Sequence, residues 1–257
     1  MAGSKKRNIG WKILMALVFA GILVLLGLQV VEWWKERKAR FVRYEAFGIE
    51  VPVNYSVHGI DVSKYQELID WESVQSMNVD NIRLRFAFIK ATEGNGNEDR
   101  CFKRNWKRAK EAGVARGAYH FFIATKSGKT QAENFISTVE LQPGDMPPVL
   151  DVEQSYGVKG DKLRQRVREW LETVENYYGV KPILYTNVDF YKQVLKDEFD
   201  DYPLWVAHYL QKERPRIHRS WHFWQYSEQG RVNGILHKTD FNVFNGDSTA
   251  FKELLIH

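Results

Sequence analysis

Two carboxylic acids separated by a single residue, Asp151 and Glu153, end the segment Val149-Leu150-Asp151-Val152-Glu153. The preceding Pro147-Pro148 excludes a helix that enters from upstream, because proline cannot continue a helix and restricts the residue before it. In an extended strand alternate side chains share a face, so both acids point the same way. Paired like charges resist ionising together, which suits general acid–base chemistry. The alternative is a strand end with two solvated acids.

Polar and aromatic side chains also stand at the ends of other segments that fit short strands. These segments are Val57–Val62, Phe86–Lys90, Ala115–Phe122, Pro148–Val152, Pro182–Thr186, Leu204–Tyr209, His222–Tyr226 and Asp240–Val243. Active sites of α/β barrels lie at the carboxyl ends of the strands. Those ends supply the candidate residues Asp61, Glu93, Tyr119, Asp151, Glu153, Tyr185, Trp205, Gln225 and Asp240. One acid at a strand end is usually a turn former, but this coincidence indicates a common site.

Helical patterns separate the first five of these strands. They lie at Trp71–Met77, Phe102–Ala112, Lys129–Val139 and Lys162–Tyr178. Alternating strands and helices predict an α/β barrel rather than a sandwich. Too little helix separates the last strands for a regular eightfold repeat.

The first part of the chain has the composition of a membrane segment. Residues 13–31 contain no charged side chain, and a run of this length can cross a bilayer as a helix. A cleaved signal peptide is the alternative, but the run is long for one and no small-residue cleavage site follows. We expect a basic cytoplasmic N-terminus at 1–12, a signal anchor at 13–31, a juxtamembrane linker at 32–54 and a catalytic barrel at 55–257. The N-terminus would lie inside, and the barrel on the periplasmic or extracellular side.

The charge distribution argues against a nucleic-acid partner. The chain has 257 residues and a net charge of +5 at pH 7. Residues 1–43 alone carry +7, so the remainder carries −2. The basic side chains therefore flank the apolar segment, and the folded part is close to neutral.

The sequence offers no obvious ligand set for a metal or a cofactor. There is no Cys-x-x-Cys pair, and the single cysteine, Cys101, excludes an intrachain disulfide. There is also no Gly-x-Ser-x-Gly nucleophile elbow, phosphate-binding loop or dinucleotide fingerprint. We expect neither a metal nor a cofactor, and we expect Cys101 to be a packed or idle thiol rather than a nucleophile.

Taken in order, these blocks resemble the motifs of the family 25 glycoside hydrolases, the Chalaropsis-type lysozymes. The matching segments are 58–63 with Gln66, 69–71, 88–94, 117–121, 148–153, 183–187, 204–209, 224–226 and 240–244. The resemblance covers residues 56–257. Two departures touch no candidate catalytic position: Glu67 replaces a common glycine, and Lys238-Thr239 make the approach to Asp240 polar.

The resemblance implies an irregular TIM-like (β/α)5(β)3 barrel. It implies hydrolysis of the β-1,4 bond between N-acetylmuramic acid and N-acetylglucosamine in peptidoglycan. It further implies that Glu153 is the general acid, with Asp151 as its electrostatic and orienting partner. Asp61 and Asp240 would complete the acidic floor of the groove. The remaining candidates for substrate contact, each with core packing or a loop position as the alternative, are Glu93, Tyr119, Tyr185, Trp205 and Gln225.

The chemistry of the acids leaves the route of hydrolysis open. Glu153, held near other anionic groups, should keep its proton to a higher pH than a free glutamate. The Cα atoms of Asp151 and Glu153 would lie about 6.6 Å apart in a strand, which does not separate retaining from inverting geometry. The substrate's 2-acetamido group could be the nucleophile, assisted by Asp151 or Asp240, with direct attack by water as the alternative.

Two other functions are compatible with these residues. A catalytically silent peptidoglycan-binding module is disfavoured because all four acids are present. A chitinase-like or other hexosaminidase is disfavoured because the usual run of alternating acids is incomplete. The expected partners are peptidoglycan glycan strands and, through residues 13–31, the membrane.

Overall fold

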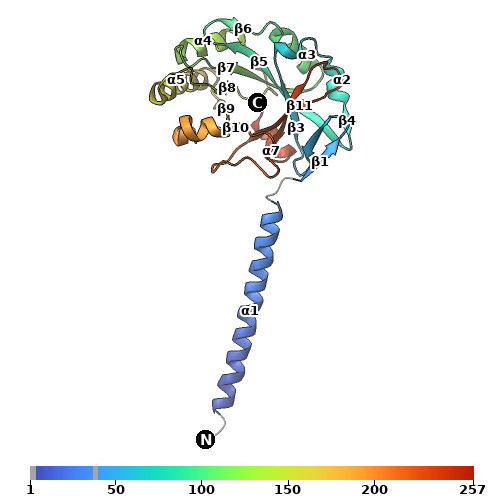
Figure 1. The fold of residues 1–257 in the computed structure, drawn as a ribbon, viewed down its shortest axis with the longest axis vertical. Coiled ribbons are helices and arrows are strands. Elements are labelled where there is room, and N and C mark those ends of the chain that lie inside the picture. Colours follow the sequence, from blue (N-terminus) through green and yellow to red (C-terminus); the bar gives the residue numbers. More distant parts are fainter. Residues whose placement is uncertain (1–3, 37–39) are drawn as a thin grey trace. The chain divides into compact units, whose positions relative to one another are not determined.

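The computed structural model of the protein describes residues 4–36 and 40–257, with side chains described for residues 10–30 and 40–257. It contains two compact units, one built on helix α1 (Ser4–Glu36) and one that begins at Arg40 and holds the barrel (Figure 1). Parts of two predicted segments, residues 1–3 of the basic N-terminus and 37–39 of the linker, lie outside the described residues.

Helix α1 contains one stretch that is long and apolar enough to cross a membrane. This stretch, Gly10–Val30, has 21 residues, a mean hydropathy of 2.7 and no buried share. At 1.5 Å per residue it would be about 31 Å long, close to the thickness of a bilayer's hydrocarbon core. The predicted N-terminal apolar helix is therefore present. A signal sequence satisfies the same criteria of length and composition.

Eight strands close into the barrel. In hydrogen-bonding order they are β3 (His58–Val62), β5 (Ile82–Glu93), β7 (Ala115–Phe121), β8 (Val149–Asp151), β9 (Ile183–Asn187), β10 (Leu204–Ala207), β11 (Phe223–Gly230) and β12 (Thr239–Phe244). Neighbouring strands from β3 to β11 are parallel. Strand β12 is antiparallel to both β11 and β3 and closes the ring. The predicted irregular α/β barrel is confirmed, and each strand overlaps a predicted one.

The reversed direction of β12 corrects one detail of the prediction. Asp240 was assigned to the carboxyl end of a strand, but it is the second residue of β12. Because β12 is antiparallel to β3, its amino end lies at the edge where the parallel strands have their carboxyl ends. Asp240 is consequently the register partner of Asp61.

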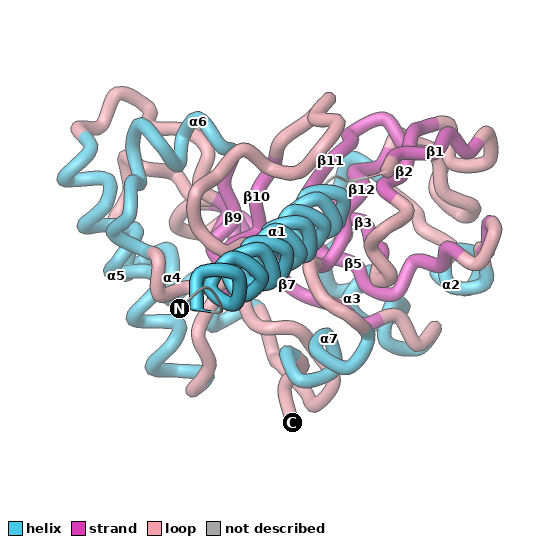
Figure 2. Tube along the Cα trace, turned by 90° about the horizontal axis from the view of Figure 1, so that it is seen from below, coloured by secondary structure: helices cyan, strands magenta, loops and turns pink. Residues whose placement is uncertain are grey.

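The four predicted helices cover the outside of the barrel. They are α2 (Trp71–Ser76), α3 (Phe102–Glu111), α4 (Gly128–Thr138) and α5 (Gly160–Tyr178). In Figures 1 and 2, α4 and α5 lie together on one side of the strands, and α2 and α3 on the other. Helix α3 illustrates how such a helix packs on the barrel. Its apolar residues Phe102, Trp106 and Ala109 recur at helical spacing and are all buried, so they form one inward face.

The connections contain shorter elements that the periodic patterns do not reveal. They are the 3-10 helix η1 (Lys64–Gln66), β4 (Asn78–Val79), β6 (Asn97–Glu98), α6 (Val188–Phe190), the π-helix η2 (Tyr191–Leu195), the 3-10 helix η3 (Lys196–Phe199) and α7 (Ser248–Leu254). All of these except α7 have two to five residues, which is too short for a hydrophobic period to show.

The segment expected to be a linker contains a folded hairpin. Strands β1 (Phe41–Tyr44) and β2 (Ile49–Pro52) pair antiparallel. Phe47 and Val51 are fully buried, and the Phe41 ring meets the Trp224 ring edge-on with centroids 5.9 Å apart. Charged residues alternate with these apolar ones, which made the segment look solvated. The folded domain therefore begins at Arg40 rather than at residue 55.

Aromatic side chains fill one end of the barrel. The Phe88 and Trp205 rings stack with centroids 4.2 Å apart, and Phe251 of α7 packs on Phe86. A Cβ atom on Gly59 would lie 2.5 Å from the Phe86 ring, so only glycine fits there. This packing closes the interior below the carboxyl ends of the strands and leaves those ends to form the site.

Candidate active site

A cavity of about 410 Å³ opens at the carboxyl ends of the barrel strands. Eight of the nine predicted site residues line it: Asp61, Tyr119, Asp151, Glu153, Tyr185, Trp205, Gln225 and Asp240. They come from seven strands or the residues just beyond them. The barrel's common edge therefore brings together residues that are up to 179 positions apart in the sequence.

Asp151 and Glu153 form a hydrogen-bonded pair in this cavity, in which the protonated Asp151 donates to the Glu153 carboxylate. Asp151 ends β8 and is only 6% exposed. Burial and the neighbouring Glu153 charge raise the pKa of Asp151 well above its usual range. Burial and then the Asp61 charge raise the pKa of Glu153. The pair therefore retains a proton at a pH where free carboxyl groups would have lost theirs.

The second oxygen of Asp151 is available for a ligand. Asp151 Oδ1 is buried and has no hydrogen-bond partner among the described residues. An unpaired buried acceptor is costly. An N–H donor of a molecule bound in the cavity would satisfy it.

Asp61 and Asp240 form a second pair on the opposite wall. Asp61 Oδ2 accepts hydrogen bonds from Gln225 Nε2 at 2.8 Å and from Asn242 Nδ2 at 2.7 Å. Burial and then the Asp61 charge raise the pKa of Asp240 to about 9. Asp240 is therefore protonated at neutral pH and donates a hydrogen bond to the Asp61 carboxylate.

Two tyrosines fix the orientation of Gln225. Tyr185 Oη donates to Gln225 Oε1 at 2.8 Å, and Tyr209 Oη donates to the same oxygen. Because the amide oxygen faces two hydroxyl donors, the amide nitrogen is directed at Asp61. Gln225 thus acts as a positioning residue for the Asp61 charge.

Trp205 fixes the orientation of Asn242. Its indole N–H donates to Asn242 Oδ1 at 2.8 Å, which directs the amide nitrogen of Asn242 at Asp61. The tryptophan is only 2% exposed, with Phe88 stacked on it and Tyr185 tilted against it at 4.3 Å between centroids. Trp205 therefore lines the cavity as part of its packed wall rather than as an open stacking surface. Tyr119 lies edge-on to it, with centroids 6.5 Å apart.

Glu93 does not line this cavity. Its carboxylate pairs with Lys90 Nζ at 2.6 Å and stays 34% exposed. Strand β5 runs on to Glu93 and pairs there with β6, which carries Glu93 to an adjoining pocket. Glu93 therefore reaches the site through Lys90, whose side chain is 12% exposed, lines the cavity and lies 4.5 Å above the Phe121 ring.

Several residues that line or support the cavity were not predicted as site residues from the sequence, among them Lys90, Tyr209 and Asn242. The charge on Lys90 opposes the rise in pKa of both Asp151 and Glu153. The spacing of Asn242, two residues after Asp240 on one strand face, is the same as that of the Asp151–Glu153 pair and could have revealed it.

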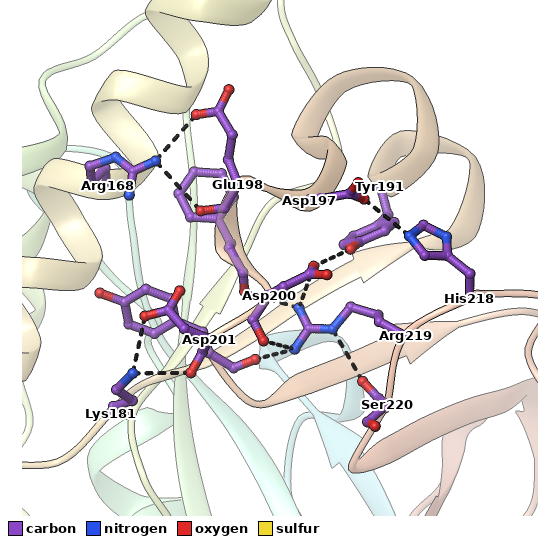
Figure 3. A network of polar contacts seen from close by, with 12 residues as sticks. Arg168, Lys181, Tyr191, Asp197, Glu198, Asp200, Asp201, His218, Arg219 and Ser220 are labelled. Carbon is purple, nitrogen blue, oxygen red and sulfur yellow. Dashed lines mark hydrogen bonds and ion pairs between the residues drawn. The ribbon is translucent and has the colours of Figure 1, made fainter.

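A different polar cluster joins the segment after β9 to the segment before β11 (Figure 3). Ligand atoms of Asp197, Asp200 and His218 lie within 4.8 Å of one another. Asp197 pairs with His218 at 3.0 Å, while Asp200 pairs with Arg219 at 3.4 Å and accepts from the Tyr191 hydroxyl. These are the contacts of an ion-pair network that ties two loops together, because each aspartate is engaged by a protein donor.

Comparisons with known proteins point in one direction. The family model described as "Glycosyl hydrolases family 25" matches residues 60–235. That range includes Asp61, Asp151 and Glu153, whereas Asp240 lies beyond it. The "Uncharacterized protein YegX" of Escherichia coli (strain K12) is 43% identical over 243 residues, covering 91% of this chain and 89% of that protein.

Characterised relatives and solved structures agree. "Lysozyme M1" of Streptomyces globisporus is 34% identical over 213 residues, which are 77% of this chain and 71% of the lysozyme. The structure of a family 25 glycosyl hydrolase from Bacillus anthracis matches with a TM-score of 0.74 and 33% identity. That match covers 84% of this chain and 100% of the Bacillus chain.

Proposed function

The chain belongs to family 25 of the glycosyl hydrolases, and we propose that Glu153 is the general acid with which it cleaves peptidoglycan. The enzyme is a muramidase, and its substrate is the glycan of peptidoglycan. We assign the cleaved linkage as the β-1,4 bond between N-acetylmuramic acid and N-acetylglucosamine. The observation that carries the assignment of roles is the hydrogen-bonded pair of the buried Asp151 and the half-buried Glu153, which retains a proton.

The proton of this pair leaves with the departing sugar. Glu153 is the less buried partner and lines the open cavity, so it takes the shared proton from Asp151 and passes it to the glycosidic oxygen as the C–O bond breaks. Asp151 then remains as a carboxylate beside the positive charge that develops on the sugar ring. The protonated Asp240 keeps the Asp61 charge in place without adding a further negative charge.

The substrate's 2-acetamido group is the nucleophile in this proposal. Its carbonyl oxygen bonds to the anomeric carbon, and its N–H donates to Asp151 Oδ1, the buried acceptor without a partner. Water then opens the cyclic intermediate and returns a proton to Glu153. Two displacements give retention of configuration. Proton NMR of the anomer that forms first tests this route. Retention supports it, whereas inversion would indicate direct attack by water.

Product analysis tests the bond assignment. The full chain in detergent is incubated with peptidoglycan, the products are reduced with borohydride and analysed by mass spectrometry. Reduced muramic acid at the new ends supports the proposal, and reduced glucosamine would contradict it. Chitin oligosaccharides are assayed in parallel, because faster cleavage of chitin would favour a hexosaminidase. Binding of peptidoglycan without any cleavage would favour a silent module.

We also propose that α1 stays attached as a membrane anchor, with residue 1 inside and the barrel on the periplasmic or extracellular side. The apolar stretch Gly10–Val30 supports an anchor, and the location of peptidoglycan supports the orientation. Alkaline phosphatase fused after residue 39, ahead of the folded domain, should be active. An inactive fusion would contradict the proposed orientation. If all of the enzyme is recovered in a form that lacks α1, the anchor is not retained.

A further inference from the structure

A second cavity, about 670 Å³ in volume, adjoins the catalytic one. The two share Tyr65 and Gln66 in their linings. Whereas the catalytic cavity has an acidic floor, the second one is lined by Lys64, Arg100 and Lys238. We call these three residues the basic rim.

The charges of the basic rim are only partly neutralised. Its single acid, Glu67, lies 4.0 Å from Arg100 and 3.7 Å from His237. Among the described residues no carboxylate lies within ion-pair distance of the ammonium groups of Lys64 or Lys238. The rim therefore keeps an excess of positive charge beside a groove of carboxyl groups.

Buried hydrogen bonds hold two segments of the rim together. Asp99, which is buried, accepts from the backbone N–H of Lys64 and from that of Cys101, both at 2.9 Å. These two hydrogen bonds fix η1 to the segment that carries Arg100.

Gln66 ties the third segment to the other two. Its Oε1 accepts from Ser63 N at 2.9 Å, and its Nε2 donates to the Lys238 carbonyl oxygen at 2.8 Å. The three cations thus come from three separate chain segments whose backbones are fixed to one another. Such preorganisation lowers the cost of binding an anion.

Glu67 has a backbone conformation that glycine would adopt more easily. Its φ of 52° and ψ of −121° lie in a region that side chains disfavour. This is also the position where the family resemblance leads one to expect glycine. The side chain that replaces it places a carboxylate between Arg100 and His237.

We propose that the basic rim binds a carboxylate of the peptide attached to muramic acid, so that the enzyme prefers peptide-bearing glycan strands to bare ones. This inference rests on the proposed function. In a peptide-bearing strand the lactyl group of muramic acid is an amide, so the sugars are neutral and the attached peptides carry the carboxylates. The acidic floor would repel those groups, and the rim is the cationic surface that adjoins it.

The test compares peptide-bearing strands with stripped strands, from which an amidase has removed the peptides and in which the freed lactyl carboxylates have been converted to neutral amides. The wild-type chain should show a higher kcat/KM on the peptide-bearing strands. Each of Lys64→Ala, Arg100→Ala and Lys238→Ala should lower that value about two- to fivefold, in line with exposed ion pairs, without changing the rate on stripped strands. The triple variant should lose the preference, and Glu67→Gln should increase it. High salt should also reduce the preference.

Lys252→Ala is the matched control. Lys252 is an exposed lysine on α7, the helix that packs at the opposite end of the barrel, and its removal should change neither rate. Equal wild-type rates on the two substrates would overturn the proposal, as would a triple variant that loses activity equally on both.

Binding separates this proposal from the muramidase assignment. Co-sedimentation of the Glu153→Gln chain with each kind of strand measures the preference without turnover. If wild type cleaves neither substrate but Glu153→Gln still prefers peptide-bearing strands, the proposed function fails and the rim stands. If binding shows no preference, the rim proposal fails.

Discussion

Asp240 and Asp61 are register partners on the antiparallel strands β12 and β3, and their carboxyl groups share a hydrogen bond. Asp240 keeps the proton, since its pKa is raised to about 9, and Asp61 accepts from three donors. Two buried carboxyl groups, Asp61 and Asp151, and two half-buried ones, Glu153 and Asp240, coexist in one cavity because protons and amide donors offset much of their repulsion.

Asp240→Asn should change how stability depends on pH. In the unfolded chain Asp240 ionises near pH 3.8, and in the folded chain near 9. Folding therefore retains a proton between these values, and the free energy of unfolding falls as pH rises, by at most about 1.4 kcal/mol per pH unit for this group. The variant lacks this term. Urea unfolding should show that the free energy of unfolding of the wild type, relative to that of the variant, is lower at pH 8 than at pH 5. The same difference between the two proteins at both pH values would contradict the protonation of Asp240.

Asp61→Asn should move the alkaline limb of the kcat/KM profile to lower pH. The Asp61 charge is the second-largest cause of the raised pKa of Glu153, after burial. Its removal lets Glu153 lose its proton earlier. Loss of a charged hydrogen-bond acceptor should also lower kcat/KM by about tenfold or more. A profile with unchanged shape would show that Asp61 does not act on the acid.

Lys90→Met should move the same limb in the opposite direction. Lys90 lowers the pKa of both members of the Asp151–Glu153 pair. Without that charge the pair holds its proton to a higher pH, so the profile of kcat/KM shifts upward. Lys90→Arg keeps the charge and should leave the limb in place. Equal shifts in the methionine and arginine variants would indicate a packing effect instead.

Tyr185→Phe and Tyr209→Phe should be mild alone and severe together. Both hydroxyls donate to the same oxygen of Gln225, so either one is enough to hold the amide nitrogen toward Asp61. The double variant frees the amide, and its loss of kcat/KM should exceed the sum of the single losses by at least about 0.5 kcal/mol. Additive losses would mean that the tyrosines act independently of Gln225.

Local sequence patterns were enough to predict the barrel strands and the acids at the carboxyl ends of the parallel strands, but not the direction of β12, which carries Asp240. Val149 to Asp151 shows why: a proline pair precedes an alternating apolar run, and the acid follows at its end. The hairpin β1–β2 was not predicted because the burial of Phe47 depends on side chains far along the chain, such as Phe241, whose ring meets the Phe47 ring edge-on.

Within the site, the positions of Lys90 and Glu93 could not be predicted from the sequence. A lysine at a strand end is usually solvated, and only the Phe121 ring and the Glu93 carboxylate make this one part of the cavity. Glu93 follows the strand motif but is carried outward by the extension of β5 toward β6. Neither outcome is encoded in local spacing, because both depend on pairing with a second segment.

The role of Glu153 as proton donor is tested most directly by Glu153→Gln on two substrates that differ in their leaving groups. The native glycan leaves as a sugar alkoxide that needs a proton, whereas an aryl glycoside of a chitooligosaccharide leaves as a stable phenolate. Glu153→Gln should lower kcat on native glycan about 10²- to 10⁴-fold and the rate on the aryl glycoside less than about tenfold. Equal losses on both substrates would contradict general-acid catalysis by Glu153.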